Sequence, residues 1–425
     1  MRSAGFAFVA AGMLAAGLPA EPARAATAQL QLDERISGPA WVRAGDAEAA
    51  RSLIALLETA EVDGLDPKKF KLGALRRAVR AAERGNASAI EKANEMLDRA
   101  LVSYVTRLRD APMSDWIIND REAIPRPPSA REILAKAAQA PSLAGWVEAM
   151  PFMHPSYTGL REALVRAEER GDERAADLLR VNLQRARFLP SSGRYLVVNT
   201  AAQRLYIYED GTIIDSMKVV VGKPHQPTPM MAATIKYTAL NPYWNVPPDL
   251  AAERVAPSVV REGTRYLKKH GYVVLSDWSE QARPVDPSTI DWKAVEAGKV
   301  QIRLRQNPGP GNAMGRMKFM FPNPQGIYLH DTPNKELLNE AARLFSGGCV
   351  RLEDAPRLAR WLYGEPLDPK GAKSEERVDL SEPVPVYLIY QTAVPSDEEV
   401  VFYDDIYGKD RSVIASAGKG RVAAR

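Results

Sequence analysis

The sequence predicts an α+β protein with a helical N-terminal half and a β-rich C-terminal half. Apolar residues recur at helical spacing from residue 46 to residue 188, and they alternate at strand spacing after Pro190. The chain of 425 residues is also too long for one compact core, which favours two domains. We expect a helical scaffold domain over 28–188, a β-rich domain over 190–392 and a C-terminal extension over 393–425.

The composition is that of an ordinary globular protein, since 45% of the residues are hydrophobic and 26% are charged. Lys and Arg number 57 against 53 for Asp and Glu, so the formal net charge is +4. This balance is too even to indicate nucleic-acid binding, and we expect no nucleic acid among the partners. The small positive excess is compatible with work beside an anionic wall polymer or a membrane surface.

The N-terminus predicts export. Arg2 precedes an apolar run from Ala4 to Leu18, and Ala23-Arg24-Ala25 offers a cleavage site of the small-x-small type. A membrane anchor is the alternative, but the run is shorter than the ~20 residues that span a bilayer. We therefore expect a signal peptide over 1–25, cleaved after Ala25, and no stable membrane span.

Capping residues and apolar stripes locate the helices of the first half. Asp46 can cap a first helix and Ser88 a long one, and further helices are expected over about 156–170 and 172–188. This half shows no catalytic grouping, so its stripes are interpreted as core. The stripes of the first two helices are Leu53, Leu56, Leu57 and Ala60, then Ile90, Ala93, Leu97, Leu101 and Tyr104.

Strand spacing begins at Tyr195. Residues 195–199 form the first expected strand, and 204–209 and 213–221 are expected to form a hairpin around the turn Asp210-Gly211. Further strands are expected near 271–275, 301–305, 316–321, 326–330 and 384–390.

A long segment, about 222–326, interrupts the strands and is rich in Pro, Gly, Asn and aromatic residues. Loops of this length inside a compact domain tend to be lids or binding loops. Tyr243 and Trp244 stand among prolines, which favours a substrate-facing lid over a solvated insertion. The polar, basic tail after Gly408 is expected to fray.

The single cysteine, Cys349, follows the small residues Ser346-Gly347-Gly348, and His330 lies nineteen positions before it. An exported chain with one cysteine cannot form an internal disulfide, so the thiol is either a small buried hydrophobe or is used chemically. A free thiol has a pKa of ~8.5, and His330 can take its proton and later return it to a leaving amine. The amides of Gly348 and Cys349 can stabilise an oxyanion, and Arg351 can bind a substrate carboxylate.

Two other chemistries fit the sequence less well. The order of histidine before cysteine disagrees with papain-like proteases, whose histidine lies far downstream. One cysteine and four scattered histidines offer no zinc-ligand spacing, so no metal is expected. The other histidines, His154, His225 and His270, lie in proline-rich or basic loops and are interpreted as surface or structural residues.

The stretch from His330 to Ser346-Gly347-Gly348-Cys349-Val350-Arg351 resembles the L,D-transpeptidase signature, a histidine followed downstream by Ser-x-Gly-Cys-x-Arg/Asn. Its flanks resemble the large Gram-negative members, which have a helical scaffold domain and a capping lid. The resemblance spans about 185–410, and the helical half resembles the scaffold more weakly. The flanking segments are 328–333, 241–248, 318–323 and 405–408.

The resemblance implies a periplasmic peptidoglycan L,D-transpeptidase, with its catalytic domain over 190–392 and a lid over about 222–326. The Cys349 thiolate would attack the carbonyl of the third residue of a donor tetrapeptide stem, release D-alanine and pass the acyl group to an amine of an acceptor stem, giving a 3-3 or 1-3 cross-link. His330 would act as base and acid, and the Gly348 amide would line the oxyanion hole. No cofactor is implied, and carbapenems are implied to acylate the cysteine. The substrate-binding residues would be Arg351, Ser346, Gly347, Tyr328, Trp244 and Asn245.

Two departures from the family pattern matter. Many members have histidine where Gly347 stands, so any polarising role of that side chain is absent here. The stretch from Arg121 to Arg180 does not resemble the peptidoglycan-binding insert that the subgroup often carries. Two alternatives stay open: an L,D-carboxypeptidase or endopeptidase that gives the same thioester to water, and an inactive wall-binding scaffold.

Overall fold

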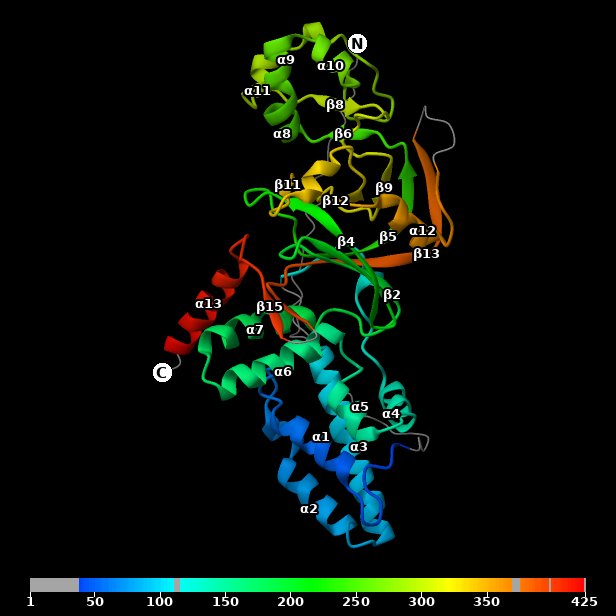
Figure 1. The fold of residues 1–425 in the computed structure, drawn as a ribbon, viewed down its shortest axis with the longest axis vertical. Helices are drawn as coiled ribbons and strands as arrows, with labels where there is room; N and C mark the ends of the chain where they lie inside the picture. Colours follow the sequence, from blue (N-terminus) through cyan, green and yellow to red (C-terminus); the bar gives the residue numbers. More distant parts are fainter. Residues whose placement is uncertain (1–37, 111–114, 369–374, 397–398, 424–425) are drawn as a thin grey trace, which may run out of the picture. The chain divides into compact units, whose positions relative to one another are not determined.

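The computed structural model describes residues 38–110, 115–368, 375–396 and 399–423 (Figure 1). The signal peptide expected over 1–25 lies outside these residues. Within the described ranges, no helix is both long and apolar enough to cross a membrane. The expected order, a helical region followed by a β-rich domain, is confirmed.

Seven α-helices make up the first half of the described chain. Asp172 caps the last of them, as expected, but Asn86 rather than Ser88 caps the long third helix. The fourth and fifth were not predicted, because the prolines between 125 and 128 hide a helix start at Ser129, which forms a capping box with Glu132. The helices are α1 (Glu48–Glu58), α2 (Leu72–Ala82), α3 (Ala87–Arg109), α4 (Ala130–Ala138), α5 (Leu143–Ala149), α6 (Pro155–Glu169) and α7 (Glu173–Ala186), with short 3-10 turns η1 (Pro67–Phe70) and η2 (Arg121–Ala123).

A buried carboxylate ties these helices together. Asp63, in the turn after α1, accepts hydrogen bonds from the hydroxyls of Tyr104 on α3 and Tyr157 on α6, both at 2.7 Å. Arg161 on α6 adds an ion pair at 2.8 Å. His154 is also structural, as interpreted from the sequence: it is buried, and its Nδ1 accepts the Ser156 amide at the start of α6.

The β-rich half is organised by one large sheet that closes on itself. Its strands follow the order β1-β5-β13-β2-β3-β4-β12-β10-β9, and β5 also pairs with β9, so the strands from β5 to β9 form a closed ring, here called the β-ring. β11 pairs with β4 outside this path. The strands are β1 (Ile117–Ile118), β2 (Arg194–Asn199), β3 (Arg204–Glu209), β4 (Thr212–Gly222), β5 (Met231–Leu240), β9 (Met317–Met320), β10 (Leu329–His330), β11 (Leu344–Ser346), β12 (Val350–Leu352) and β13 (Glu376–Ile389).

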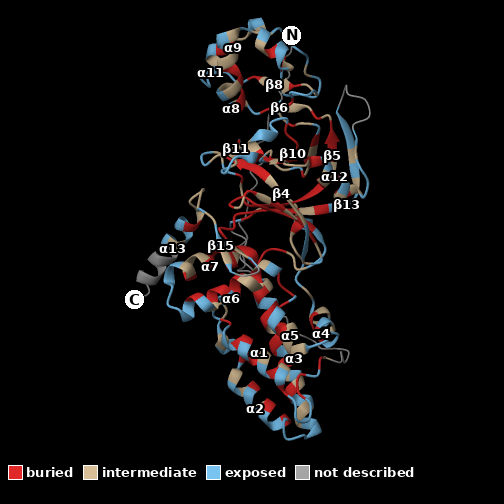
Figure 2. Cartoon of the chain, in the orientation of Figure 1, coloured by how far each residue is buried: buried red, intermediate tan, exposed pale blue. Residues whose placement is uncertain are grey.

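The two faces of the β-ring bury different clusters (Figure 2). One cluster contains Leu196, Leu329 and Val350, together with apolar side chains of helix α12 (Ala355–Tyr363). Asp354 caps this helix by accepting the Arg357 amide. The other cluster contains Tyr195 and neighbouring strand residues, with Phe188 and Leu189 from the end of the helical half. The second cluster therefore joins the helical half to the β-ring.

The segment between β5 and β9 packs as a unit with its own apolar core, here called the insertion (residues 241–316). The sequence placed it at about 222–326, but β5 and β9 belong to the β-ring, so the separately packed part is narrower. Its elements are β6 (Trp244–Val246), α8 (Pro248–Leu250), the π-helix η3 (Ala251–Val255), α9 (Ala256–Glu262), α10 (Arg265–Lys269), β7 (Tyr272–Leu275), η4 (Pro287–Thr289), α11 (Trp292–Glu296) and β8 (Arg303–Gln306). A further 3-10 turn, η5 (Lys335–Asn339), follows β10.

The C-terminal extension contains β14 (Ala393–Pro395), β15 (Val400–Phe402) and helix α13 (Lys409–Ala423). The expectation that the chain frays after Gly408 is wrong at the start of this helix. Asp410 is 1% exposed, forms an ion pair with Arg185 of α7 at 2.5 Å and accepts the Thr392 hydroxyl. This helix was not predictable from hydrophobic spacing, because it docks through a charged side chain and shows no apolar stripe.

Removing the Asp410 charge should destabilise the protein. Breaking a buried ion pair on one side leaves the other charge uncompensated and typically costs about 3–5 kcal/mol. We expect Asp410→Asn to lower the free energy of unfolding by about this amount in urea titrations. Asp404→Asn, at an exposed position six residues earlier, is the matched control and should have little effect. Equal stability of the two variants would contradict a structural role for the Arg185–Asp410 pair.

Candidate active site

The pairing of β10 with β12 brings the predicted histidine and cysteine onto one face. The two strands run parallel, with Leu329 opposite Val350 and His330 opposite Arg351. Leu329 and Val350 are buried in the core of the β-ring. Because successive side chains of a strand point to opposite faces, His330, Arg351 and Cys349 project to the face away from that core. Tyr328 lies next to them in the chain, and its carbonyl accepts the Val350 amide at 2.9 Å.

Lys318 enters the same face from the other neighbouring strand. It pairs with His330 across β9 and β10, whereas Phe319 beside it is buried in the core. Its ammonium group lies 3.7 Å from the centroid of the Tyr328 ring. Burial lowers the pKa of Lys318, and the nearby Cys349 opposes that shift. The site therefore carries a cation that the sequence did not single out.

The Cys349 thiol is held by the loop that precedes β10. Its Sγ donates to the carbonyl of Gly326 at 3.4 Å. Burial raises the pKa of the thiol, while the Tyr328 amide and the charges of Lys318 and Arg351 act in the opposite direction. Burial is the largest of these effects, so the thiol of the free protein is protonated at neutral pH.

The His330 ring is arranged to accept a proton through Nε2. It is 2% exposed, and its Nδ1 lies 2.6 Å from the backbone oxygen of Asp331. A carbonyl oxygen can only accept, so Nδ1 carries the hydrogen and Nε2 is left with a lone pair. Burial, reinforced by the charge of Arg351, lowers the pKa of His330 to about 3. The imidazole is therefore neutral, and in this structure the thiol is bonded to Gly326 rather than to it.

The carbonyl that orients His330 is itself fixed. The carboxylate of Asp331 accepts the Arg316 amide at 2.9 Å and the Lys335 ammonium at 2.8 Å. Gly315 makes room for this carboxylate, because a Cβ there would lie 2.4 Å from Asp331 Oδ2. These contacts hold the peptide of Asp331 and, through it, the tautomer and direction of the imidazole.

The turn before Cys349 presents one free amide. Gly348 has φ of +113°, which favours glycine, and its N–H donates to Ser346 Oγ at 3.1 Å. Its carbonyl accepts the hydroxyl of Thr228 at 2.7 Å. Among the residues that the structure describes, none accepts a hydrogen bond from the Cys349 amide. Of the two amides expected to bind an oxyanion, that of Cys349 is available and that of Gly348 is occupied.

Arg351 is a half-buried cation that forms no ion pair with any described residue. Its Nε is buried with no hydrogen-bond partner, and within the described ranges its guanidinium forms no ion pair. Burial lowers its pKa, and Arg254 on η3 of the insertion acts in the same direction. A carboxylate placed against Arg351 would satisfy both guanidinium groups at once.

The insertion contacts this turn directly. A Cβ on Gly347 would lie 3.3 Å from the side chain of Leu250, at the end of α8. Beside this contact, Lys223 and Glu253 form an ion pair at 2.8 Å. The glycine at 347, where many resembling proteins have histidine, leaves the space that Leu250 occupies.

Comparison with known protein families covers both halves of the chain. Residues 193–386 match the model of the L,D-transpeptidase catalytic domain, and residues 33–164 match that of the Scaffold domain. Cys349, His330 and Arg351 all lie within the first match.

Residues 193–386 therefore match an L,D-transpeptidase catalytic domain, preceded by a match to a Scaffold domain over 33–164.

Individual L,D-transpeptidases are similar over part of the chain. A Haemophilus influenzae protein whose name assigns it to this family is 35% identical over 242 residues, which are 55% of this chain and 48% of that protein. The chain thus spans about half the length of this relative. Solved structures of an L,D-transpeptidase from Mycobacterium smegmatis and of an LD transpeptidase in complex with imipenem are 15% and 13% identical, with TM-scores of 0.23 and 0.22. In both comparisons the aligned part covers 47% of this chain and 59% of the solved chain.

Two residues expected at the substrate site lie on β6 of the insertion. Trp244 is half-buried and packs against the apolar core of the insertion, with its ring centroid 6.4 Å from that of Tyr272. Asn245 is exposed and pairs with Arg305. The structure does not bring either residue into contact with Cys349, whereas Leu250 does reach the catalytic turn.

Four residues at or near the site were not predicted from the sequence: Thr228, Leu250, Arg254 and Lys318. Lys318 could have been predicted, because side chains alternate along the strand expected over 316–321. This alternation puts Lys318 on the face opposite the buried Phe319. The other three come from loops or the insertion and carry no local signal. Within the described part of the chain, no group of three or more His, Cys, Asp or Glu residues is placed to hold a metal ion.

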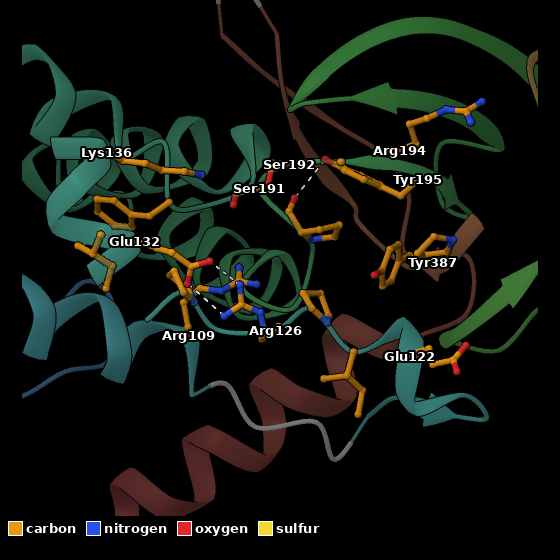
Figure 3. Close-up of a pocket in the computed structure, with 18 of the residues that line it drawn as sticks. Arg109, Glu122, Arg126, Glu132, Lys136, Ser191, Ser192, Arg194, Tyr195 and Tyr387 are labelled. Atoms are coloured by element: carbon orange, nitrogen blue, oxygen red, sulfur yellow. Dashed lines mark hydrogen bonds and ion pairs between the residues drawn. The ribbon is translucent and has the colours of Figure 1, made fainter. Parts of the chain in front are cut away.

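A cavity of about 440 Å³ lies elsewhere, where Arg126, Glu132 and Lys136 approach Tyr195 and Tyr387 (Figure 3). Arg126 and Glu132 form a two-pronged ion pair across it, with N–O distances of 2.5 and 3.1 Å. None of the candidate catalytic residues lines this cavity. The candidate catalytic residues lie instead on the face around Cys349.

The protonated thiol gives a test by alkylation. The rate of reaction with iodoacetamide should rise with pH through an inflection above the ~8.5 of an unperturbed thiol, because burial disfavours the thiolate. Removing a cation disfavours it further, so Lys318→Met should move the inflection upward and Lys318→Arg should not. Cys349 is the only cysteine, so alkylation reports on one site. An inflection below ~8.5, or one unaffected by Lys318→Met, would contradict this account.

Proposed function

We propose that this protein is a peptidoglycan L,D-transpeptidase in which Cys349 is the nucleophile and His330 is the general base and acid. The observation that carries the proposal is the shared face of β10 and β12, onto which a free thiol and a neutral imidazole both project, with Nδ1 of the imidazole held by a carbonyl. The match of this segment to a transpeptidase catalytic domain supports the same reading.

The first half-reaction forms a thioester. His330 Nε2 takes the proton of Cys349 as its sulfur attacks the carbonyl of the third stem residue, and the Cys349 amide donates to the resulting oxyanion. The intermediate collapses with cleavage of the bond to D-alanine, and His330 returns the proton to the leaving amine. Since the resting thiol points to Gly326, substrate binding must turn it towards the imidazole.

The second half-reaction transfers the acyl group. An amine of a neighbouring stem attacks the thioester, loses its proton to His330 and releases the Cys349 thiolate, which is reprotonated. The acceptor amine determines whether the cross-link is 3-3 or 1-3. Water as the acceptor would make the enzyme an L,D-carboxypeptidase, and the contact of Leu250 with the catalytic turn disfavours free water access.

Substrate recognition in this proposal rests on charge. Peptidoglycan stems carry free carboxylates, and Arg351 is a half-buried cation whose Nε has no hydrogen-bond partner among the described residues. Tyr328, Ser346 and Gly347 surround the thiol and contact the stem backbone. Trp244 and Asn245 enter the proposal as residues of the insertion, which acts as a lid over the bound stem.

The proposed partners are a donor tetrapeptide stem and an acceptor stem, and the proposed compartment is the periplasm. The apolar run and the small-x-small site of the first 25 residues support export, and a wall substrate places the work outside the cytoplasm. No cofactor takes part in the steps above, because thiol, imidazole and amide supply the nucleophile, the proton transfer and the oxyanion contact.

Turnover of a defined disaccharide tetrapeptide should depend on both reacting groups. Cys349→Ala should give no product, because it removes the nucleophile, and His330→Gln should give little at pH 7, with the loss shrinking as the pH approaches the thiol pKa. Mass analysis of the products distinguishes a cross-linked dimer from a free tripeptide. The exposed His270→Gln is the matched control and should match the wild type. A tripeptide alone would make the enzyme a carboxypeptidase, and full activity of Cys349→Ala would remove the proposed mechanism.

Carbapenems should label the nucleophile. Incubation with a carbapenem should give one covalent adduct per chain, and it should map to the peptide containing Ser346 to Arg351. The adduct should be missing in Cys349→Ala and slow to form in His330→Gln, and penicillins should react more slowly than carbapenems. Intact-protein and peptide mass spectrometry measure both. An adduct on a serine would instead indicate the chemistry of penicillin-binding proteins.

A further inference from the structure

The motif Asp405-Ile406-Tyr407-Gly408 resembles the family but takes no part in the chemistry above. In the structure, its carboxylate and its tyrosine are fixed against the β-ring. Asp405 accepts the hydroxyl of Tyr390 at 2.8 Å, and the same hydroxyl accepts the Tyr407 amide at 3.0 Å. The rings of Tyr390 and Tyr407 stack with centroids 5.3 Å apart. Tyr407 is therefore held by two direct contacts with Tyr390, which Asp405 holds in turn.

The Tyr407 hydroxyl reaches the end of β4. It donates to the carbonyl of Gly222 at 2.7 Å. The chain folds back closely over Gly222, where a Cβ would lie 2.2 Å from Gln226 O and 2.6 Å from the Thr228 amide nitrogen. Only glycine fits in this position, so the loop after β4 is fixed relative to Tyr407.

Thr228 connects this loop to the catalytic turn. Its hydroxyl accepts the Gly222 amide at 3.0 Å and donates to the carbonyl of Gly348 at 2.7 Å. The side chain is 1% exposed, so water does not compete for either bond. The single hydroxyl hydrogen is committed to Gly348, because the Gly222 amide can only donate.

A fixed Gly348 carbonyl fixes the Cys349 amide. The peptide bond between them is planar and trans, so its C=O and N–H point in opposite directions. Thr228 holds the oxygen from one side, and the N–H of Cys349, which has no partner among the described residues, must then point to the other. This amide is the available donor for the oxyanion.

We propose that Thr228 and Tyr407 are positioning residues that orient the Cys349 amide in the oxyanion hole, so that the C-terminal extension contributes to the catalytic rate. The inference rests on the proposed acyl-transfer function, but it concerns residues that touch neither the thiol nor the imidazole. It predicts that acyl transfer, which builds negative charge on oxygen, depends on Thr228. Alkylation of the same thiol by iodoacetamide builds no oxyanion and should not depend on it.

The test compares the two reactions in the full-length chain. Thr228→Val keeps the shape and removes the hydroxyl, and it should slow carbapenem acylation and kcat by roughly 10- to 100-fold while leaving the alkylation rate unchanged. Thr228→Ser keeps the donor and should restore acylation to near the wild-type rate. Tyr407→Phe removes the outer contact and should slow acylation by about 3- to 10-fold, since the Thr228 bond remains.

A matched control is available on β5. Thr234 is 2% exposed and its hydroxyl is buried without a partner, so Thr234→Val makes the same chemical change without breaking a hydrogen bond. It should leave both reactions at wild-type rates. Wild-type acylation by Thr228→Val would overturn the inference, and so would an equal fall in acylation and alkylation, which would indicate general disorder. A wild-type protein that is alkylated but never acylated would instead overturn the proposed function itself.

Discussion

The register between β10 and β12 is the constraint on which the site depends. Leu329 and Val350 are buried on the core side of the β-ring, and this burial fixes which residues face outward. A slip of one residue in either strand would turn the thiol or the imidazole into the core and expose apolar side chains. Apolar packing therefore determines which face Cys349 and His330 occupy. The hydrogen bonds around Asp331 and Gly348 then fix the orientation of the imidazole and of the turn.

Strands could be predicted from the sequence where the local pattern of apolar residues matches the burial that tertiary structure imposes. The bounds predicted for three strands, 195–199, 204–209 and 213–221, agree within one residue with those of β2, β3 and β4. They agree because alternation of apolar residues reflects burial of one face of the sheet. Closure of the sheet was not predictable, since β5 pairs with β9 across the whole insertion. The helices of the insertion were hidden by their prolines, and α13 by its lack of an apolar stripe.

Only part of the candidate site could be predicted from the sequence. Cys349 and His330 belong to one compact motif, so their chemistry could be inferred from residue types and spacing. Thr228 could not be inferred, because its hydroxyl acquires a meaning only when folding places it against Gly348, 120 positions away. Trp244 packs on the core of the insertion, so an aromatic residue among prolines indicates the insertion but not which of its residues reach the catalytic turn.

The state of the resting thiol has a consequence for durability. Oxidants such as peroxides and disulfides attack the thiolate far faster than the thiol, and a lone sulfenic acid has no second cysteine in this chain to rescue it. Burial, which raises the pKa of Cys349, and the hydrogen bond from its thiol to Gly326 therefore disfavour oxidation of the free protein. A thiol kept in this state reacts slowly with electrophiles, but it is also oxidised slowly.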